Sequence, residues 1–419
     1  MSKTKETSLS RHGLINWRKI ISSIFFAKTA VAPFAIAPFL IGGYIDHLGL
    51  TVGEASKVLS IEIFALALSN ALAFFWVSRI SCRVWAQRFL ITLIFLNIFC
   101  IYAPGYNALI VLRVLVGFAE GALLALGFGL LSNTERPNRN FGLYFAVSLS
   151  IGAINVQIMP LFLETAGATG LFINLSIYSV VALTISGWCQ RNSITEENTA
   201  NYIEDAEKGH LDTPETTPTS RSTNSSKIDF PLLPLSFLLL ANYIYFIGQG
   251  GVWSFLERLG LQQNLTLDNI ASALALSLLA GVAGGATASW LDLKLGRVAP
   301  LMTAIALAIL SIFILSTSQG LVAFTLAACL FNYGNNLGHP YILGFAAKID
   351  KSARLTVLSG ALHTAGQATG PLVAGMLIID GDFSYVLRLG VGAFLTTVLL
   401  FVPVLILGRR KSILSSKYE

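Results

Sequence analysis

Long apolar runs separated by short polar connections fill most of the 419-residue chain. A helix needs about 20 apolar residues to cross the hydrocarbon core of a bilayer, and twelve segments reach or approach that length. The predicted spans cover residues 20–45, 56–78, 89–104, 107–131, 141–163, 170–189, 230–255, 268–291, 298–316, 320–346, 355–379 and 384–408. The third looks short. Barrel strands alternate and give no long apolar runs, so the pattern predicts an all-α integral membrane protein.

A single long polar stretch, residues 190–229, interrupts this pattern. It is rich in Ser and Thr and punctuated by Pro, which is typical of a flexible linker. The linker divides the spans six and six. The predicted organisation is therefore a cytoplasmic tail (1–19), a first six-helix bundle (20–189), a cytoplasmic linker (190–229), a second six-helix bundle (230–408) and a second cytoplasmic tail (409–419).

The two halves carry similar sequences at matching points. Asp46-His-Leu-Gly-Leu follows the first predicted span, and Glu257-Arg-Leu-Gly-Leu follows the seventh. Each is followed by a short polar stretch with a threonine, Thr51 or Thr266, before the next span. This favours a duplicated unit and two pseudo-symmetric six-helix bundles, twelve transmembrane helices in all. Such repeats are typical of secondary transporters.

The composition excludes several classes of protein. Hydrophobic residues make up 54% of the chain and charged residues only 12%, against roughly 25% charged in soluble proteins. The mean hydropathy is +0.69. A disordered chain, a collagen and a disulfide scaffold are excluded, and a soluble enzyme is nearly excluded. The four cysteines lie far apart without metal-binding spacing, and no P-loop motif is present. We therefore expect no metal, no cofactor and no nucleotide-driven pump.

The Lys and Arg residues are unevenly distributed between the loops on the two sides of the predicted membrane. If the N-terminus is cytoplasmic, the inside segments hold 23 of the 28 Lys and Arg residues. The outside segments hold Lys57, Arg258 and Arg388, and two more, Lys28 and Arg113, lie within spans. The positive-inside rule then predicts that both termini are cytoplasmic, and it explains the net charge of +6 without a nucleic-acid partner. We expect a multi-pass monomer in the lipid bilayer of a cell (inner) membrane.

Twelve spans divided six and six resemble the major facilitator superfamily. The clearest motif is Arg113-Val-Leu-Val-Gly117-Phe-Ala-Glu120-Gly121 in the fourth span, which is similar to the family's R-x-x-x-G signature. The loop Leu291-Asp292-Leu-Lys-Leu-Gly296-Arg297 after the eighth span is similar to the family's gating motif, with one extra residue before Gly296. The resemblance implies that Asp292 and Arg297 take part in gating, and that spans 3, 6, 9 and 12 face lipid.

The sequence departs from the family pattern in two places, and each bears on the function that the resemblance implies. The loop after the second span, residues 78–88, keeps positive charge but lacks the glycines and aspartate of the gating motif. The fifth span lacks the glycine- and proline-rich motif of drug/proton antiporters, although a similar string, residues 366–375, occurs in the eleventh. These departures weaken the hypothesis of a drug exporter but do not exclude it.

Four ionisable side chains lie inside predicted spans of the first half: Lys28, Glu62, Arg113 and Glu120. A charge at mid-bilayer costs at least about 2.5 kcal/mol, and such residues usually line a pathway. Glu62 and Arg113 stand about equally far from the outer ends of their spans, so we expect them to meet. The hypothesis assigns proton coupling to Glu62, Glu120 and Arg113, and substrate binding to Lys28 and Arg113. The alternative is a set of structural ion pairs.

The second half carries neutral polar faces instead. Residues at helical spacing share one face on each of the seventh, tenth and eleventh spans. The predicted substrate-binding residues are Asn242, Tyr245, Gln249 and Trp253, then Asn332, Asn336 and His339, then His363 and Gln367. Three converging polar faces favour a wet binding site. Interhelical hydrogen bonding is the alternative, at about 0.6 kcal/mol per bond.

These features predict a secondary active transporter of a small polar organic solute, working by alternating access. The buried cations slightly favour an organic anion or zwitterion, and a proton is the expected coupling ion. The alternatives are a multidrug or metabolite exporter of the same architecture, and a transporter-like receptor that binds without moving its ligand. Enzyme activity is not expected, since no nucleophile–base pair occurs at helical spacing.

Overall fold

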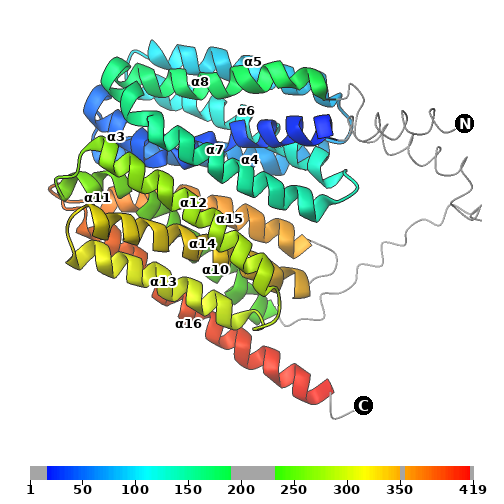
Figure 1. The fold of residues 1–419 in the computed structure, drawn as a ribbon. Helices are drawn as coiled ribbons and strands as arrows, with labels where there is room; N and C mark the ends of the chain where they lie inside the picture. Colours follow the sequence, from blue (N-terminus) through cyan, green and yellow to red (C-terminus); the bar gives the residue numbers. More distant parts are fainter. Residues whose placement is uncertain (1–16, 190–231, 350–353, 416–419) are drawn as a thin grey trace, which may run out of the picture.

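The computed structural model describes residues 17–189, 232–349 and 354–415, which form helices joined by short turns, without any strand (Figure 1). The predicted linker, 190–229, lies outside the described residues.

The first half contains a helix over residues 17–30 and then shorter and longer helical elements. These are α2 (Ala32–Ala35), α3 (Ala37–Leu48), α4 (Val52–Leu72), η1 (Ala73–Phe75), α5 (Cys82–Ile101), α6 (Tyr106–Ser132), α7 (Pro137–Ala166), α8 (Ala168–Ile185) and η2 (Ser186–Trp188). The second half contains α10 (Leu232–Ser254), α11 (Leu256–Gln262), α12 (Leu267–Leu291), α13 (Val298–Thr317), α14 (Leu321–Ile349), α15 (Arg354–Leu377) and α16 (Ser384–Ser415).

The helices pack as two bundles that lie side by side (Figure 1). In the first, α6 packs on α4 and α5, and α5 packs on α8. In the second, α10 packs on α15 and α16, and α14 packs on α12 and α13. The bundles meet mainly where α15 lies on α4 and α12 lies on α7. The predicted all-α, two-bundle membrane fold is confirmed.

Each of the twelve predicted spans coincides with one helix or with a broken run of helices. Nine helices of the described part are long and apolar enough to cross a membrane. The predicted spans outside this group are the first, which is broken, and those of α14 and α15, which carry many of the predicted polar site residues.

The third span is not short, and that prediction was wrong. α5 begins at Cys82, seven residues before the predicted start at 89. Its first two turns include Arg83, Gln87 and Arg88, which interrupt the apolar pattern, but side-chain hydrogen bonds hold these turns in place. Arg83 Nε donates to the Cys189 carbonyl at 2.6 Å, and Gln87 Nε2 donates to Ser186 Oγ at 3.0 Å.

Proline breaks the first span into three pieces. Pro33 opens α2 and Pro38 opens α3, and the residues between the pieces, Val31 and Ile36, leave helical geometry. Pro38 has no N–H, so the carbonyl four residues earlier, on Phe34, loses its partner within the helix. This free carbonyl becomes a contact point between the bundles.

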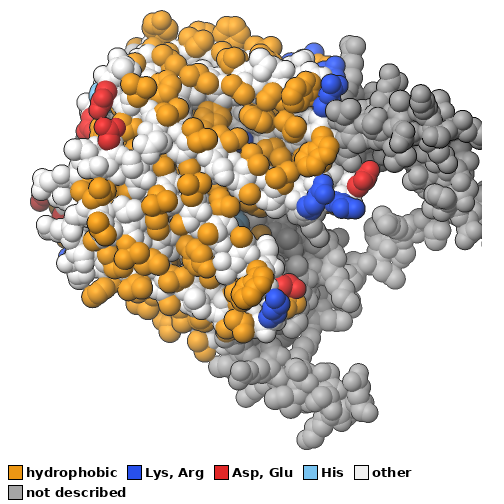
Figure 2. All heavy atoms as spheres, in the orientation of Figure 1, with side chains coloured by type: hydrophobic (Ala, Val, Ile, Leu, Met, Phe, Trp, Pro, Cys, Tyr) orange, Lys and Arg blue, Asp and Glu red, His pale blue; other side chains and the backbone are white. Residues whose placement is uncertain are grey.

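The two ends of the molecule differ in charge. Apolar side chains cover the flank, and the Lys and Arg visible on the face in Figure 2 gather at the end where residue 17 and the last turn of α16 lie. We call this the inner end, following the orientation that the sequence predicts. The opposite end, which holds α11 and the turn between α3 and α4, is the outer end.

Candidate functional site

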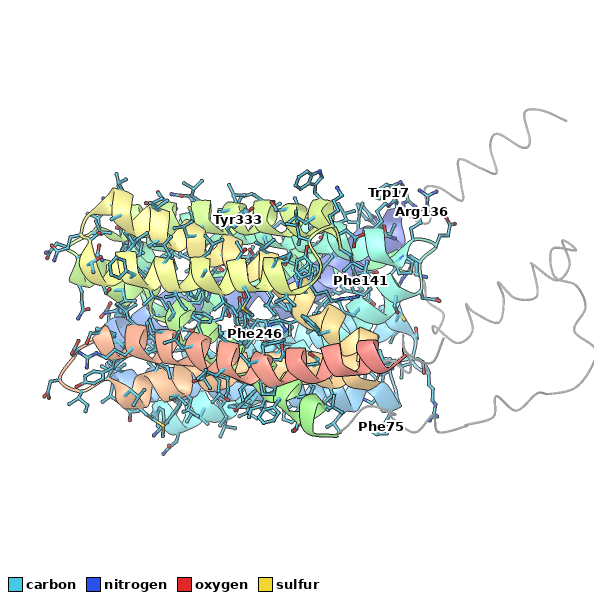
Figure 3. All side chains as sticks on the ribbon, turned by 90° about the horizontal axis from the view of Figure 1, so that it is seen from below. Trp17, Phe75, Arg136, Phe141, Phe246 and Tyr333 are labelled. Atoms are coloured by element: carbon cyan, nitrogen blue, oxygen red, sulfur yellow. The ribbon has the colours of Figure 1, made fainter. Side chains whose placement is uncertain are left out.

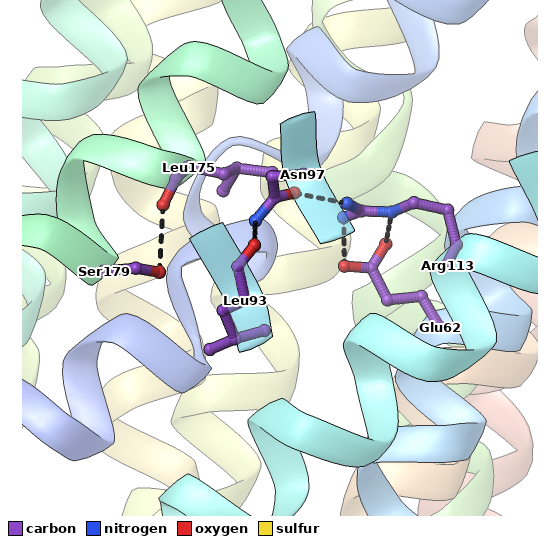
Figure 4. A network of polar contacts seen from close by, with 6 residues as sticks. All are labelled: Glu62, Leu93, Asn97, Arg113, Leu175 and Ser179. Atoms are coloured by element: carbon purple, nitrogen blue, oxygen red, sulfur yellow. Dashed lines mark hydrogen bonds and ion pairs between the residues drawn. The ribbon is translucent and has the colours of Figure 1, made fainter. Parts of the chain in front are cut away.

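An ion-pair cluster lies inside the first bundle (Figure 4). Arg113 on α6 has no exposed surface and donates from both Nε and Nη2 to the two carboxylate oxygens of Glu62 on α4, with Nε 2.9 Å from Oε2. Its third nitrogen, Nη1, donates to Asn97 Oδ1 at 2.9 Å, and the Asn97 amide in turn donates to the Leu93 carbonyl. The predicted meeting of Glu62 and Arg113 is confirmed.

Two glycines make this contact possible. A Cβ at Gly117 would collide with the Glu62 carbonyl, and one at Gly121 would collide with the Leu66 carbonyl and lie 2.7 Å from Ser69 Cβ. Small residues four apart let two helices approach closely in a membrane. The R-x-x-x-G pattern therefore delivers the Arg113 side chain to α4 at the depth of Glu62.

Glu120, two turns further along α6 than Arg113, is also buried, with 3% of its surface exposed. Its carboxyl lies within hydrogen-bonding reach of the Glu62 carboxyl, and its Oε2 has no hydrogen-bond partner among the described residues. The cluster thus contains two carboxyls and one guanidinium. It is electrically neutral when one carboxyl carries a proton.

Asn97 was not among the predicted site residues. It stands alone in the apolar run of the third span, Phe95-Leu-Asn97-Ile-Phe99, and that isolation was the available signal. A lone amide in lipid leaves donors unsatisfied, and here Arg113 and a helix carbonyl satisfy it.

Lys28 occupies the first bundle near its boundary with the second. Only 2% of its surface is exposed, and its ammonium lies 5.6 Å from the centroid of the Tyr178 ring. A Cβ at Gly152 would stand 3.5 Å both from Lys28 Nζ and from Leu278 of the opposite bundle. Within the described residues, Lys28 has neither an acidic partner nor a hydrogen-bond acceptor. It is a buried cation without a counter-charge.

Aromatic and imidazole rings from three helices of the second bundle form a compact group. The His363 ring centroid lies 3.9 Å from that of Phe246 and 4.4 Å from that of His339. Gln367 Nε2 is 3.3 Å from His363 Nε2. Figure 3 places Phe246 in the middle of the molecule, away from both ends. The structure thus brings together three predicted site residues, His339, His363 and Gln367, all partly exposed.

Other predicted residues of the second bundle serve its internal packing. Asn242 Nδ2 donates to the Ser359 carbonyl at 2.7 Å, and Asn332 Nδ2 donates to Ser277 Oγ at 2.9 Å. Tyr245 is fully buried against Phe246 and Phe394. Asn242 and Asn332 thus make the interhelical hydrogen bonds of the alternative interpretation, whereas the Tyr245 hydroxyl has no hydrogen-bond partner among the described residues.

Asn336 lies close to the other bundle, and Gln249 is buried with an oxygen unpartnered among the described residues. A Cβ at Gly281 of α12 would meet Asn336 Nδ2 at 2.7 Å and Leu149 of α7 at 3.6 Å, so Asn336 stands beside the α7–α12 contact. Gln249 is 5% exposed, and its Oε1 lacks a hydrogen-bond donor in the described part of the chain.

The bundles are joined at the outer end by charges that the sequence analysis did not assign to the site. Arg258 of α11 donates from Nη1 to Asp46 Oδ1 at 3.0 Å and from Nη2 to Asp46 Oδ2. Its Nε lies 2.8 Å from Glu257 Oε2. A Cβ at Gly42 would stand 2.7 Å from Glu257 Oε2, so glycine makes room for the group. We call Asp46, Glu257 and Arg258 the outer seal.

The repeated motif was the signal for this seal. Asp46 and Glu257 occupy the same position in the two copies, and the structure joins both through one arginine. Trp253, a predicted binding residue, closes the same region: its Nε1–H donates at 2.7 Å to the Phe34 carbonyl that Pro38 leaves free. The indole N–H of Trp253 therefore forms a hydrogen bond between the bundles in this structure.

Contacts between α7 and α12 differ between two glycines of α12. Gly281 of α12 faces Leu149 of α7, but a Cβ at Gly285, one turn further inward on the same face, would meet nothing within 4 Å. Hydrogen bonds between described residues of the two bundles, such as Gln157 to Ser272 at 3.1 Å, lie outward of this point. The printed hydrogen bonds between the bundles therefore lie toward the outer end in the described part of the chain.

The predicted gating residues lie at the inner end of α12. Asp292 adopts a left-handed backbone (φ 45°), and its carbonyl accepts from the Tyr341 hydroxyl at 3.0 Å. Arg297 lies against α14, where a Cβ at Gly344 would stand 3.2 Å from its Nε. No ion pair joins Asp292 and Arg297 within the described residues. Their gating role stays a prediction.

The outer seal gives a first testable prediction. Ser56 of α4 is fully buried against Gly375 of α15 just inside the outer end. In a Ser56→Cys background, Arg258→Gln is expected to speed labelling by an impermeant thiol reagent, because the link between the bundles is lost. Arg388→Gln, an exposed outer arginine beyond the seal, is the control. Equal labelling rates with and without Arg258 would contradict a sealing role.

Two helix bundles with buried charges at their boundary define a multi-pass membrane protein of the kind that includes secondary transporters. The family model described as Major Facilitator Superfamily matches residues 21–349. The chain belongs to this family, as its motifs predicted.

Solved structures with a similar fold are transporters of this architecture. They include a peptide transporter, POT, in complex with sulfate (TM-score 0.69, 15% identity, covering 94% of this chain and 95% of that one). They also include the nucleoside transporter NupG (TM-score 0.71, 11% identity, covering 94% of this chain and 98% of that one). A third is a POT family transporter in complex with 5-aminolevulinic acid (TM-score 0.69, 15% identity, covering 94% of this chain and 96% of that one). Among curated proteins, none matches the sequence.

Proposed function

We propose that this protein is a proton-coupled secondary transporter of small organic anions or zwitterions, working by alternating access. The observation that carries the proposal is Lys28, a buried cation without a counter-charge at the boundary between the bundles. A charge inside a membrane needs a partner, a wet cavity or a ligand. A substrate carboxylate supplies that partner when it binds.

The Glu62–Arg113–Glu120 cluster supports proton coupling. Two carboxyls within hydrogen-bonding reach and one guanidinium form a group that is neutral with one proton and anionic without it. Taking up and releasing that proton changes which carboxyl pairs with Arg113. Because the cluster joins α4 to α6, and α4 lies on α15 of the other bundle, such a change of partner can bias the contact between the bundles.

The outer seal supports alternating access, because it joins the two bundles at one end of the molecule. With the outer seal closed, a solute would reach Lys28 and the His339–His363–Gln367 group from the inner end. Breaking the contacts of Arg258 with Asp46 and of Trp253 with Phe34 would open the other side. A small zwitterion such as the 5-aminolevulinic acid bound in one similar structure carries the carboxylate that Lys28 needs.

Lys28→Met tests the proposal, because it removes the charge and keeps an unbranched apolar stem. We expect the variant to fold with an unchanged or higher melting temperature, since an unpaired buried charge is costly. A carboxylate-containing ligand should raise the melting temperature of the wild-type protein, with about 2.7 kcal/mol of added stability at 100 times Kd. Lys28→Met should lose this shift in a thermal-shift screen of small carboxylates, peptides and nucleosides.

Lys28→Arg is the matched control, because it keeps the charge and should keep the shift. Equal shifts in the wild-type protein and in Lys28→Met would contradict a carboxylate site at this position. Uptake of the same ligand into proteoliposomes then separates a transporter from a receptor that binds without moving its ligand.

A further inference from the structure

Five of the six tryptophans stand at the inner end: Trp17, Trp76, Trp85, Trp188 and Trp290. Three of them have a basic side chain over the ring. Arg139 lies 5.8 Å from the centroid of Trp17, Arg88 lies 4.8 Å from that of Trp85, and Lys294 lies 4.8 Å from that of Trp290. We call these three pairs the inner clamps.

The cations of the inner clamps are accessible at the surface. Arg88, Arg139 and Lys294 are exposed, and none of them forms an ion pair within the described residues. Trp290 has 70% and Trp17 49% of its surface uncovered, whereas Trp85 is half-buried. An exposed indole beside an exposed cation matches the chemistry of the membrane interface, where the ring sits at headgroup depth and the charge reaches outward.

The charge balance at this end selects the headgroup. The basic residues with described side chains are Arg18, Lys19, Arg79, Arg83, Arg88, Arg136, Arg139, Lys294 and Arg297, against the acidic Glu135 and Asp292. The outer end reverses the balance, with Asp46, Glu54, Glu164, Glu257, Asp268, Asp380 and Asp382 against Lys57, Arg258 and Arg388. Only the inner end therefore complements a negatively charged surface.

We propose that the inner clamps bind anionic phospholipid headgroups of the leaflet at the inner end. The indole of each clamp packs against the acyl–headgroup boundary, and its Arg or Lys pairs with the lipid phosphate. The cation–π contact holds the cation in place beforehand, so less side-chain freedom is lost when the phosphate binds. In the third clamp, Trp290 lies in the last turn of α12 and Lys294 in the turn that follows, three residues before Arg297, which adds a second cation.

The test uses the purified full-length protein in mild detergent with added phosphatidylglycerol or phosphatidylcholine. Native mass spectrometry counts the lipids retained, and thermal unfolding measures stabilisation. We expect phosphatidylglycerol to be retained and to raise the melting temperature more than phosphatidylcholine does. The variant Arg88→Gln/Arg139→Gln/Lys294→Gln should lose this difference, with affinity falling about fivefold per cation removed at low salt.

Two controls make the result specific. Arg88→Lys/Arg139→Lys/Lys294→Arg keeps the charges and should keep the retained lipid. Arg388→Gln removes a cation that lies 4.9 Å from the Tyr385 ring at the outer end, and it should change nothing. The proposal is overturned if the glutamine variant, folded in phosphatidylcholine, still retains as much phosphatidylglycerol as the wild-type protein.

Discussion

Replacing Arg113 with leucine is expected to lower the free energy of unfolding by roughly 3–5 kcal/mol, because Glu62 then remains buried without its counter-charge. Glu62 has no exposed surface, and both its carboxylate oxygens accept from Arg113. Asn97 loses its bond to the same guanidinium. Chemical unfolding of the purified protein in detergent measures the loss.

The double variant Arg113→Leu/Glu62→Leu separates the charge effect from a simple loss of packing. Removing both partners leaves no uncompensated ion, so the double variant should be more stable than Arg113→Leu alone. Asn97→Leu is the smaller control, since it removes one neutral acceptor. An Arg113→Leu protein as stable as the wild type would show that Glu62 finds another partner or takes up a proton at no cost.

The apolar pattern was enough to predict the helices because the thickness of a bilayer fixes their length. It failed at the start of α5, where Arg83 and Gln87 are polar yet helical. There the helix is held by bonds to Cys189 and Ser186, which lie about 100 residues further along the chain. The hydropathy of one segment cannot predict contacts with residues so distant in the sequence.

Depth along a helix predicted one pair of the candidate site. Glu62 and Arg113 were expected to meet because each lies at a similar distance from the outer end, and they do. Periodicity also placed polar residues on common faces of the second bundle. It could not tell whether the neighbouring helix would offer an acceptor. Asn242 and Asn332 find one inside their own bundle, whereas His363 meets another imidazole.

The outer seal could not be predicted from either copy of the repeated motif taken alone. The sequence shows matching motifs at Asp46 and Glu257, but the motifs alone indicate only that the two halves arose from a duplicated unit. The seal arises because both copies end at the line where the bundles meet, so that Arg258 reaches both acids. Residues at equivalent positions of two repeats are therefore worth testing as contacts between the halves.

Glu120→Gln is expected to abolish accumulation driven by a pH gradient while leaving the protein folded. Glutamine keeps the size of the side chain and imitates the protonated acid, so the cluster keeps one carboxylate and one guanidinium and stays neutral at every stage of the cycle. Glu62 and Arg113 keep their ion pair, which preserves stability. Glu62→Gln differs, because it strips Arg113 of its counter-charge and should lower the melting temperature.

Proteoliposomes give the two readouts that distinguish a proton site from a structural one. With an imposed pH gradient, Glu120→Gln should fail to concentrate a substrate that the wild-type protein concentrates. With substrate on both sides and no gradient, it should still exchange labelled for unlabelled molecules, because exchange needs both conformations of the loaded protein but no net proton movement. Glu164→Gln, an exposed acid near the outer end of α7, should retain both activities. Full accumulation by Glu120→Gln, with exchange unchanged, would remove Glu120 from the coupling mechanism and leave it a packing residue of the first bundle.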